Sequence, residues 1–432
     1  MLMKPFLYCL LLATTLGLNA QDWEAAPVLT SLAAAFENPE EAYKLELRLS
    51  EKGIASELEL LKQIHKLKQL RILHINEGRY AESSANLNFD LILPKIAELP
   101  YLIELHLESN DIALLPERFG GMTNLKTLNL YDNKLTILPP NLSKIEKLET
   151  LLLSKNRLTK LPANIGNLAA LKVLDLSDNA INELPESING WKALEQLNLH
   201  NNNLVALPIN FVQLSTLKKL ILSKNKFNKL KLDGLSGLLE LDLSQNQLKS
   251  LPQKLEASTA LRVVLLTENK ITNFTKGIEL LKDLPIEHLV LSKNKIVKLP
   301  KNIGKLGNLV KLELSEMPKV HWEDAFELLQ EVKTLEALII DNADMVKLPA
   351  NIVDLKQLKI LSLNNNQLRE LPATLGQVSG LTALYLNNNA LPTLPEALKD
   401  LENLQWLEAE NTGLNTIEDK IKEWFPNATI KL

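Results

Sequence analysis

The chain has 432 residues, of which 46% are hydrophobic, 23% are charged and 5% are aromatic. Its 48 basic and 52 acidic residues give a net charge of -4, which excludes the strong basic excess typical of nucleic-acid-binding proteins. Cys9 is the only cysteine, so no disulfide can form within the chain. We therefore expect no nucleic-acid partner and a fold that is stabilised by packing alone.

Residues 1–20 are typical of a cleaved secretory signal. Lys4 precedes an apolar run over residues 6–18, and Asn-Ala-Gln supplies a cleavage site after Ala20. The alternative is an N-terminal membrane anchor, but this run is shorter than the ~20 residues that span a bilayer. We expect an exported protein (periplasmic, cell-surface or secreted) without stable membrane insertion after cleavage. The absence of cysteine after cleavage favours a bacterial source.

Residues 21–41 predict a short N-terminal helical cap, and residues 42–415 consist of a repeat. Each unit reads LxxLxLxxNxL followed by xxLPxxLxxLxx, usually with a period of 23, which gives about 16 units. The asparagine of the unit recurs at Asn110, Asn133, Asn156, Asn179, Asn202, Asn225, Asn246, Asn269, Asn294, Asn366 and Asn389. A repeat of this length predicts a solenoid in which each unit buries its apolar face against its neighbours.

Within a unit, the alternation LxL predicts a short strand. Leu128 and Leu130 point into the core, and Asn129 and Tyr131 point out of it. Stacked strands form a parallel sheet, and each fully buried leucine stabilises the fold by roughly 1.5–3 kcal/mol. The Leu-Pro pair of the second half, as at Pro139, prevents a long helix, so we expect extended or short helical segments outside the sheet.

These motifs, together with "LPANIGNLAAL" at residues 161–171, resemble the leucine-rich-repeat family. The repeat unit resembles the 23-residue LPxxLxxL type, which is found in Ras-suppressor, plant disease-resistance and bacterial leucine-rich repeats. The resemblance covers nearly the whole chain. It implies an α/β repeat solenoid, a horseshoe with a parallel concave β-sheet and short helical or extended convex segments. It also implies that the asparagines form a ladder of hydrogen bonds inside the turns, which their carboxamides suit chemically.

Four places depart from the regular unit. Residues 79–90 form an insertion that we expect to be a polar loop, with a functional loop as the alternative. "GIELLKDL" at residues 277–284 predicts a true outer helix, and the irregular unit at 317–343 contains a helical pattern over 323–335. Residues 416–432 predict a C-terminal cap that ends in a last strand, "ATIKL".

The sequence contains no recognisable catalytic or metal-binding motif. None of the six histidines has a second histidine or a cysteine at metal-ligand spacing, and no phosphate-binding, dinucleotide-binding or serine-hydrolase string occurs. We therefore expect no enzyme activity and no cofactor. Two lysine clusters, at residues 218–232 and 293–311, are expected to be solvated.

The concave surface offers the candidate binding residues. Aliphatic, aromatic and histidine side chains are predicted to point out of the sheet and contact a partner at Tyr131, Leu152, His200, Ile221, Val263, Leu265, His288, Val290, Ile339, Tyr385 and Trp406. Val263, Leu265 and Val290 should form an exposed apolar cluster beside His288. Exposed aromatic residues are favoured interface anchors. The alternative for the aliphatic residues is that they occur here only because such side chains are favoured in strands, without contacting a partner. The alternative for Trp406 is that it packs against the C-terminal cap.

The sequence thus favours a non-enzymatic, exported module that binds a protein or peptide on its concave face. One alternative is a cell-surface adhesin for carbohydrate or host matrix, which would require stacking aromatics backed by polar groups. Another is a structural repeat protein that self-associates through its terminal units, which would show a concentration-dependent mass.

Overall fold

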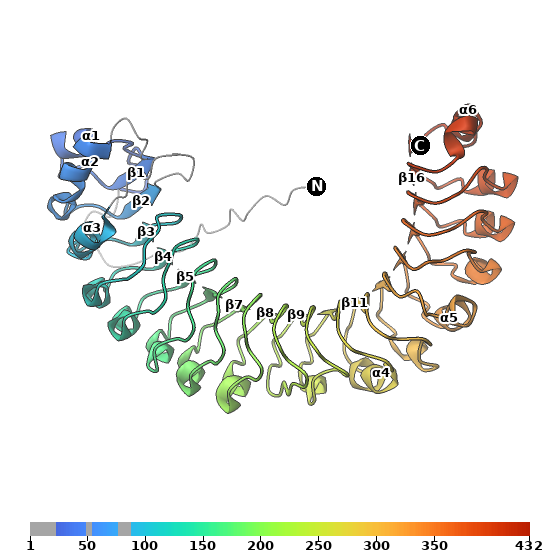
Figure 1. The fold of residues 1–432 in the computed structure, drawn as a ribbon, viewed down its shortest axis with the longest axis horizontal. Coiled ribbons are helices and arrows are strands. Elements are labelled where there is room, and N and C mark those ends of the chain that lie inside the picture. Colours follow the sequence, from blue (N-terminus) through green and yellow to red (C-terminus); the bar gives the residue numbers. More distant parts are fainter. Residues whose placement is uncertain (1–22, 49–53, 77–87) are drawn as a thin grey trace.

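The structure, a computed structural model, describes residues 23–48, 54–76 and 88–432, which form an open arc (Figure 1). Strands line the concave side of the arc, and short helices cover its convex side. The predicted horseshoe-shaped α/β repeat solenoid is therefore confirmed. The predicted signal at 1–20 lies outside the described residues, as does most of the predicted loop at 79–90.

The concave side is a single 17-stranded sheet in which each strand is parallel to the next strand in the chain. The strands are β1 (Lys44–Arg48), β2 (Ile72–Asn76), β3 (Glu104–His106), β4 (Thr127–Asn129), β5 (Thr150–Leu152), β6 (Val173–Asp175), β7 (Gln196–Asn198), β8 (Lys219–Ile221), β9 (Glu240–Asp242), β10 (Val263–Leu265), β11 (His288–Val290), β12 (Lys311–Glu313), β13 (Ala337–Ile339), β14 (Ile360–Ser362), β15 (Ala383–Tyr385), β16 (Trp406–Glu408) and β17 (Thr429–Lys431).

The convex side is built mainly from single 3-10 turns, with a few α-helices. The α-helices are α1 (Leu32–Glu37), α2 (Ile54–Leu61), α3 (Phe89–Ile96), α4 (Thr275–Leu281), α5 (Trp322–Leu329) and α6 (Glu418–Trp424). The 3-10 helices are η1 (Ile64–Lys66), η2 (Glu117–Gly121), η3 (Pro140–Lys144), η4 (Ile165–Asn167), η5 (Glu186–Gly190), η6 (Ile209–Gln213), η7 (Leu255–Ala257), η8 (Ile303–Lys305), η9 (Ala350–Asp354), η10 (Ala373–Gln377), η11 (Glu396–Asp400) and η12 (Leu414–Ile417).

The Leu-Pro motif explains why most outer segments are so short. Pro116 and Pro139 are extended, with φ of -71° and -67°, and each directly precedes a 3-10 helix. Proline fixes φ and removes a backbone donor, so an α-helix cannot continue through it. The units that contain α4 and α5 lack this motif, and there the outer segment becomes a true α-helix. The outer helix predicted at 277–284 is therefore present, although it spans Thr275–Leu281.

The core is a continuous column of leucines between the sheet and the outer turns. Leu125, Leu128 and Leu130 are completely buried, and the same positions are buried in the neighbouring units. Trp191 is also fully buried, as its place in the repeat predicts, and its Nε1 donates to the carbonyl of Ile165 at 3.0 Å. The indole donor is thus satisfied inside the core.

The asparagine ladder implied by the resemblance is present. Asn156 Nδ2 donates to the carbonyls of Leu130 in the preceding unit, at 2.9 Å, and of Leu153 in its own unit, at 3.0 Å. Its Oδ1 accepts from the backbone N–H of Leu135 at 3.0 Å. The carboxamide therefore satisfies buried backbone groups of two units at once, where unpaired groups would be costly.

Two predicted helix and loop boundaries are wrong. The loop predicted at 79–90 ends early, because α3 begins at Phe89, whose side chain is buried; Asn88 accepts a hydrogen bond from the N–H of Asp90 and caps the helix. The helix predicted at 323–335 ends at Leu329, since the chain must turn there to enter β13.

The two ends of the sheet are covered differently. At the N-terminal end, α1 lies beside β1, and Leu29 pairs with Leu45 in a parallel bridge. At the C-terminal end, α6 is followed by β17, which pairs with β16 as the sequence predicts. Ile421 and Phe425 are buried in this end.

Candidate functional site: the concave sheet

Three rows of outward side chains cross the concave face. On β10, Val263 belongs to the first row and Leu265 to the middle row; Thr267, two residues further, belongs to the third. Because neighbouring strands are in register, each row continues from unit to unit along the arc. A partner on this face would contact side chains from several rows and several units.

Ten of the predicted contact residues are half-buried on this face rather than freely exposed; they are Tyr131, Leu152, His200, Ile221, Val263, Leu265, His288, Ile339, Tyr385 and Trp406. Four of them, namely Tyr131, His200, His288 and Trp406, already have partners within the protein. Lys155 Nζ lies 5.1 Å from the centre of the Tyr131 ring, and this contact raises the pKa of Lys155. His200 Nδ1 lies 2.8 Å from Ser223 Oγ.

Val290 is only 5% exposed, so the prediction that it presents an apolar surface is wrong. It lies in register between the longer side chains Leu265 and Glu313, on strands ~4.8 Å away on either side. The same crowding buries serines of the third row, namely Ser154, Ser177, Ser223 and Ser292. Outward direction in a parallel sheet therefore does not by itself make a side chain accessible.

The central cluster is brought together as predicted, although it is less apolar than expected. Val263 pairs in register with His288. His288 Nε2 lies 3.0 Å from Glu313 Oε1, and Lys311 Nζ lies 2.7 Å from the same oxygen. The hydrogen bond with His288, supported by Lys311, lowers the pKa of Glu313 to about 2. A charged network therefore borders this cluster.

A more exposed apolar surface lies on β13–β16. Among the described residues, Ile360 is the one strand residue in the set of exposed large hydrophobic side chains, at 38% exposure. Its neighbours in the first row are Ala337 and Ala383, whose small side chains leave both sides of Ile360 open. We call this surface the C-terminal patch; it comprises Ala337, Ile339, Ile360, Ala383, Tyr385 and Trp406.

The sequence reasoning missed Ile360, although a signal for it exists. Ile360 alternates with the buried Leu361, which places it on the outward face. Its exposure depends on the two alanines of the adjacent strands, and sequence periodicity shows neither which residues become neighbours nor how far each protrudes.

Polar side chains border the C-terminal patch on its third-row side. Asp341 accepts hydrogen bonds from Ser362 Oγ at 2.7 Å and from the N–H of Asn364 at 2.8 Å. Asn364 Oδ1 in turn accepts from the N–H of Asn387, whose Nδ2 donates to Glu408 at 3.2 Å. The border is thus a connected chain of hydrogen bonds that fixes the rim of the patch.

Trp406 is partly covered from the C-terminal side. Lys431 Nζ lies 4.8 Å from the centre of its ring and 2.9 Å from Glu408 Oε1. The hydrogen bond from Lys431 lowers the pKa of Glu408. The packing of Trp406 against the last strand, which the sequence left as an alternative, is therefore present, and the side chain remains half-buried rather than fully covered.

The N-terminal part of the concave face carries a second titratable cluster that the sequence reasoning did not identify. His74 is hydrogen-bonded to Glu108, and its ring centre lies 5.5 Å from that of His106. The hydrogen bond to Glu108 raises the pKa of His74. Burial is the largest single influence and raises the pKa of Glu108, but the hydrogen bonds with His74 and the backbone, together with the charges of His74 and His106, outweigh it, so the net pKa is lowered. Within residues 23–48, 54–76 and 88–432, no group of three or more His, Cys, Asp or Glu side chains could hold a metal ion.

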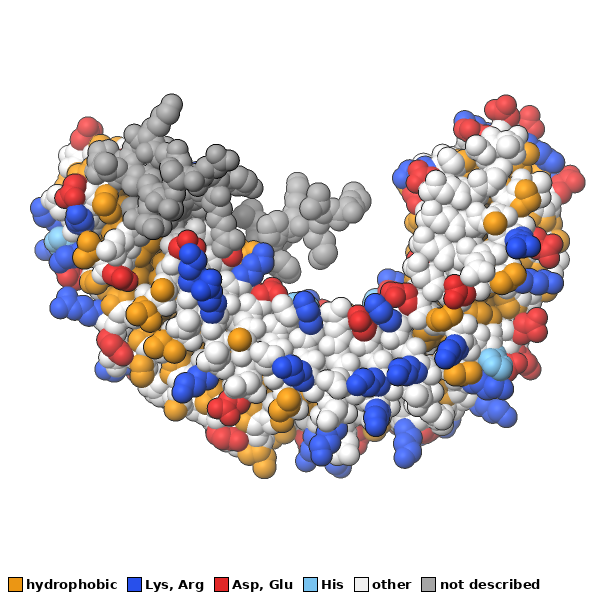
Figure 2. All heavy atoms as spheres, viewed as in Figure 1, with side chains coloured by type: hydrophobic (Ala, Val, Ile, Leu, Met, Phe, Trp, Pro, Cys, Tyr) orange, Lys and Arg blue, Asp and Glu red, His pale blue; other side chains and the backbone are white. Residues whose placement is uncertain are grey.

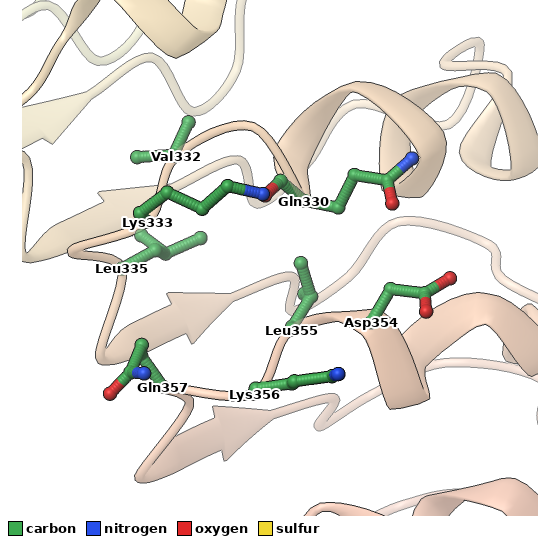
Figure 3. Close-up of a pocket in the computed structure, with 8 residues that line it drawn as sticks. All are labelled: Gln330, Val332, Lys333, Leu335, Asp354, Leu355, Lys356 and Gln357. Carbon is green, nitrogen blue, oxygen red and sulfur yellow. The ribbon is translucent and has the colours of Figure 1, made fainter.

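A small hollow of about 270 Å³ lies away from the concave face, between the outer parts of two successive units (Figure 3). Val332, Leu335 and Leu355 contribute apolar atoms to it, and Lys333 and Asp354 lie at its sides. It sits where the longer unit of α5 meets the shorter unit of η9.

Comparison with known proteins identifies the repeat. The family described as Leucine rich repeat matches residues 100–158, 146–204 and 356–414. Curated proteins give no match. A leucine-rich-repeat protein of Leptospira interrogans, a solved structure, is 30% identical with a TM-score of 0.71, over 94% of this chain and 100% of that one.

Two other solved structures are more distant. The functional domain of InlJ from Listeria monocytogenes, which includes a cysteine ladder, is 25% identical with a TM-score of 0.56, over 74% of this chain and 65% of that one. The plant peptide hormone receptor RGFR1, in complex with RGF2, is 22% identical with a TM-score of 0.53, over 86% and 62% of the two chains, and shows the fold alone. The present chain has only Cys9, so it cannot build a cysteine ladder.

Proposed function

Because this chain belongs to the leucine-rich-repeat family, we propose that it is an exported interaction module that binds a partner protein or peptide through the C-terminal patch. The observation that carries this proposal is the exposed Ile360, flanked by two alanines and surrounded by Ile339, Tyr385 and Trp406. Binding is by surface complementarity, and no bond is made or broken.

The composition of the patch is that of a protein interface. Its centre is apolar and its border is polar, which is the usual anatomy of such interfaces. Tyr and Trp are enriched among the residues that contribute most to binding. Because the rim is fixed by hydrogen bonds from Asp341 through Asn364 and Asn387 to Glu408, little ordering is needed when a partner binds.

A protein or peptide is favoured over an uncharged carbohydrate on this face. Stacking of sugar rings would require a platform of open aromatic faces. Tyr385 pairs in register with Ser362 and Glu408 rather than with Trp406, and Lys431 lies over the ring of Trp406. A plant receptor of the same fold is in complex with a peptide hormone, which supports the compatibility of the fold with a peptide.

Export is the part of the proposal that rests on the N-terminal sequence. Residues 1–20 have the order of a secretory signal, and they lie outside the described residues. In the part of the chain that the structure describes, no helix is long and apolar enough to cross a bilayer. The similarity to proteins of Leptospira and Listeria favours a bacterial source, with the periplasm, the cell surface or the medium as the destination.

The test is a cross-linking capture from the native host and its surroundings, with residues 21–432 as bait. The patch variant carries Ile360→Ser, Tyr385→Ser and Trp406→Ser. Its matched control carries three serine substitutions at other predicted apolar contacts, namely Leu152→Ser, Ile221→Ser and Leu265→Ser. We expect the wild type and the control to capture the same protein, and the patch variant to bind it at least about tenfold more weakly, because such anchors contribute about 2 kcal/mol or more.

Each other outcome contradicts a different part of the proposal. If only the control variant failed to capture the protein, the binding site would lie on the central part of the sheet. Equal capture by all three folded proteins would exclude the concave face. No capture, together with a mass that rises with concentration in light scattering, would favour self-association.

A further inference from the structure

The charge of the molecule is unevenly distributed along the arc. The four segments that follow β8, β9, β10 and β11 contain twelve lysines and only two acidic residues, although the whole chain has a net charge of -4. Figure 2 shows basic side chains gathered over the middle of the arc. We call this surface the lysine flank; it comprises residues 223–233, 244–254, 267–277 and 292–302.

Summed over several units, the same position on either side of the flank has the opposite charge balance. The equivalent segments after β13 to β16 carry three basic and seven acidic residues; they are residues 341–351, 364–374, 387–397 and 410–420. Those after β3 to β7 carry five basic and seven acidic residues; they are residues 108–118, 131–141, 154–164, 177–187 and 200–210. The lysine flank is therefore a bounded basic surface with more acidic surface on either side.

Hydrogen bonds place the four segments side by side. The N–H of Gln247 donates to the carbonyl of Phe227, that of Lys270 to Leu248, and that of Lys295 to Ile271, each at 2.8 Å. With adjacent strands ~4.8 Å apart, the four segments span roughly 15 Å at the sheet edge, and more toward the wider convex side. Their lysines therefore form one continuous band along the arc.

Most of these lysines are not neutralised by the protein itself. All twelve are exposed. Lys293 is shared between Glu268 and Glu316, Lys298 pairs with Asp324, and Lys231 lies 3.8 Å from its own neighbour Asp233. The other nine make no ion pair with any described residue; they are Lys224, Lys226, Lys229, Lys249, Lys254, Lys270, Lys276, Lys295 and Lys301. Lys270 donates instead to the neutral Gln247 Oε1 at 3.0 Å.

We propose that the lysine flank binds a linear anionic polysaccharide, whose sulfate or carboxylate groups lie along the four segments. Closely spaced like charges repel one another and attract a polyanion, which releases its counterions on binding. A chain-like ligand matches a band that follows the arc over successive units. This surface is separate from the C-terminal patch, and recognition here depends on charge rather than on stacking.

Other polyanions fit the flank less well. Sequence-tolerant binding of single-stranded nucleic acid relies on exposed aromatic rings, and the aromatic residues of these segments, Phe227 and Phe274, are buried in the core. An extended anionic membrane would also face the acidic segments after β13 to β16, which would repel it. A narrow linear ligand can lie along the lysine flank alone and so avoid the acidic segments.

The test measures binding of heparin, used as the probe, to residues 21–432 by calorimetry at about 0.15 M salt, where exposed charges act over only ~8 Å. The flank variant carries Lys226→Glu, Lys249→Glu, Lys270→Glu and Lys295→Glu. The matched control carries Lys144→Glu, Lys160→Glu, Lys347→Glu and Lys356→Glu, at exposed lysines elsewhere, so that both variants have the same net charge. We expect the flank variant to lose at least tenfold in affinity and to show a shallower dependence of affinity on salt, while the control changes by less than threefold.

The proposal is overturned if the flank variant, folded by circular dichroism, binds heparin as the wild type does, or if the control loses as much. Tighter binding of single-stranded DNA or of phosphatidylglycerol vesicles than of heparin would also overturn it, because the ligand class would then be wrong. The patch variant with Ile360→Ser, Tyr385→Ser and Trp406→Ser should bind heparin normally, so this result is independent of the proposed protein partner.

Discussion

At the residue scale, the turn after each of the strands β3 to β16 contains a residue with a left-handed backbone, which the sequence pattern does not reveal. Asp132, Lys155 and Asn201 have φ of 59°, 52° and 52°, and each directly precedes the ladder asparagine of its unit. The left-handed region is unfavourable for residues other than glycine. Aspartate, lysine, glutamine and glutamate all occupy the position, and where the next residue is a ladder asparagine its hydrogen bonds offset this cost.

A prediction at this scale concerns Glu313, whose pKa of about 2 lies below the ordinary 4.5 because of its hydrogen bond with His288 and the charge of Lys311. A carboxyl group whose pKa is depressed in the folded state stabilises the fold above pH 4.5 and loses this contribution as the pH falls toward 2. Glu313→Gln should therefore lower the free energy of unfolding at neutral pH, and its difference from the wild type should shrink between pH 4.5 and 2. Urea unfolding at a series of pH values measures this.

The control is a carboxyl titration of Glu313 by carbon-13 NMR in the wild type and in His288→Gln. Removal of the imidazole should raise the pKa of Glu313, since Lys311 alone remains beside it. A wild-type carboxyl that titrates at its ordinary pH would contradict the role assigned to the pair.

At the scale of the element, the spacing of the outer turns is set by glycine. A Cβ at Gly166, in η4, would lie 1.7 Å from the carbonyl oxygen of Ser187 in the next turn, and one at Gly376, in η10, would lie 1.9 Å from that of Ala397. Turns with glycine at this position can therefore approach more closely than turns with any side chain. The glycine of "LPANIGNL", Gly166, is explained by this contact rather than by an unusual backbone angle.

Gly166→Ala should destabilise the protein by about 1–3 kcal/mol, the usual range for a side chain forced into a packed contact. The cause is steric, because the added methyl group must push the turn of Ser187 away. Gly307→Ala is the matched control, since a Cβ there meets no atom within 4 Å. Denaturant unfolding of both variants measures the effect, and an equal stability of the two would refute the explanation.

At the scale of the whole molecule, stability is a sum over neighbouring units. The sheet pairs each strand only with the units before and after it, and the leucine core continues in the same way. A solenoid of this kind behaves as a chain of nearest-neighbour interactions. Damage in one unit is therefore expected to remain local, so that distant binding surfaces such as the lysine flank and the C-terminal patch can be altered separately.

Leu220→Ala, in the middle of β8, tests this expectation. Leu220 is completely buried, and its truncation should cost about 2–5 kcal/mol. Hydrogen exchange followed by mass spectrometry should show the greatest loss of protection around β7, β8 and β9, and little change in β3 or β15. The exposed Val205→Ala serves as the control. A uniform loss along the arc would instead indicate one cooperative unit.

The sequence by itself determined the repeat, the parallel concave sheet, the asparagine ladder and the place of the outer helix α4. The first three follow from local chemistry that recurs along the chain, such as the alternation around Leu128 or the proline after Leu138, whereas the place of α4 follows from the helical pattern of residues 277–284. Only the tertiary structure decided that Val290 is covered, that Ile360 is exposed, and that the lysines of four separate segments form one band. The reason is that accessibility depends on side chains more than twenty residues away, which stacking brings within ~5 Å.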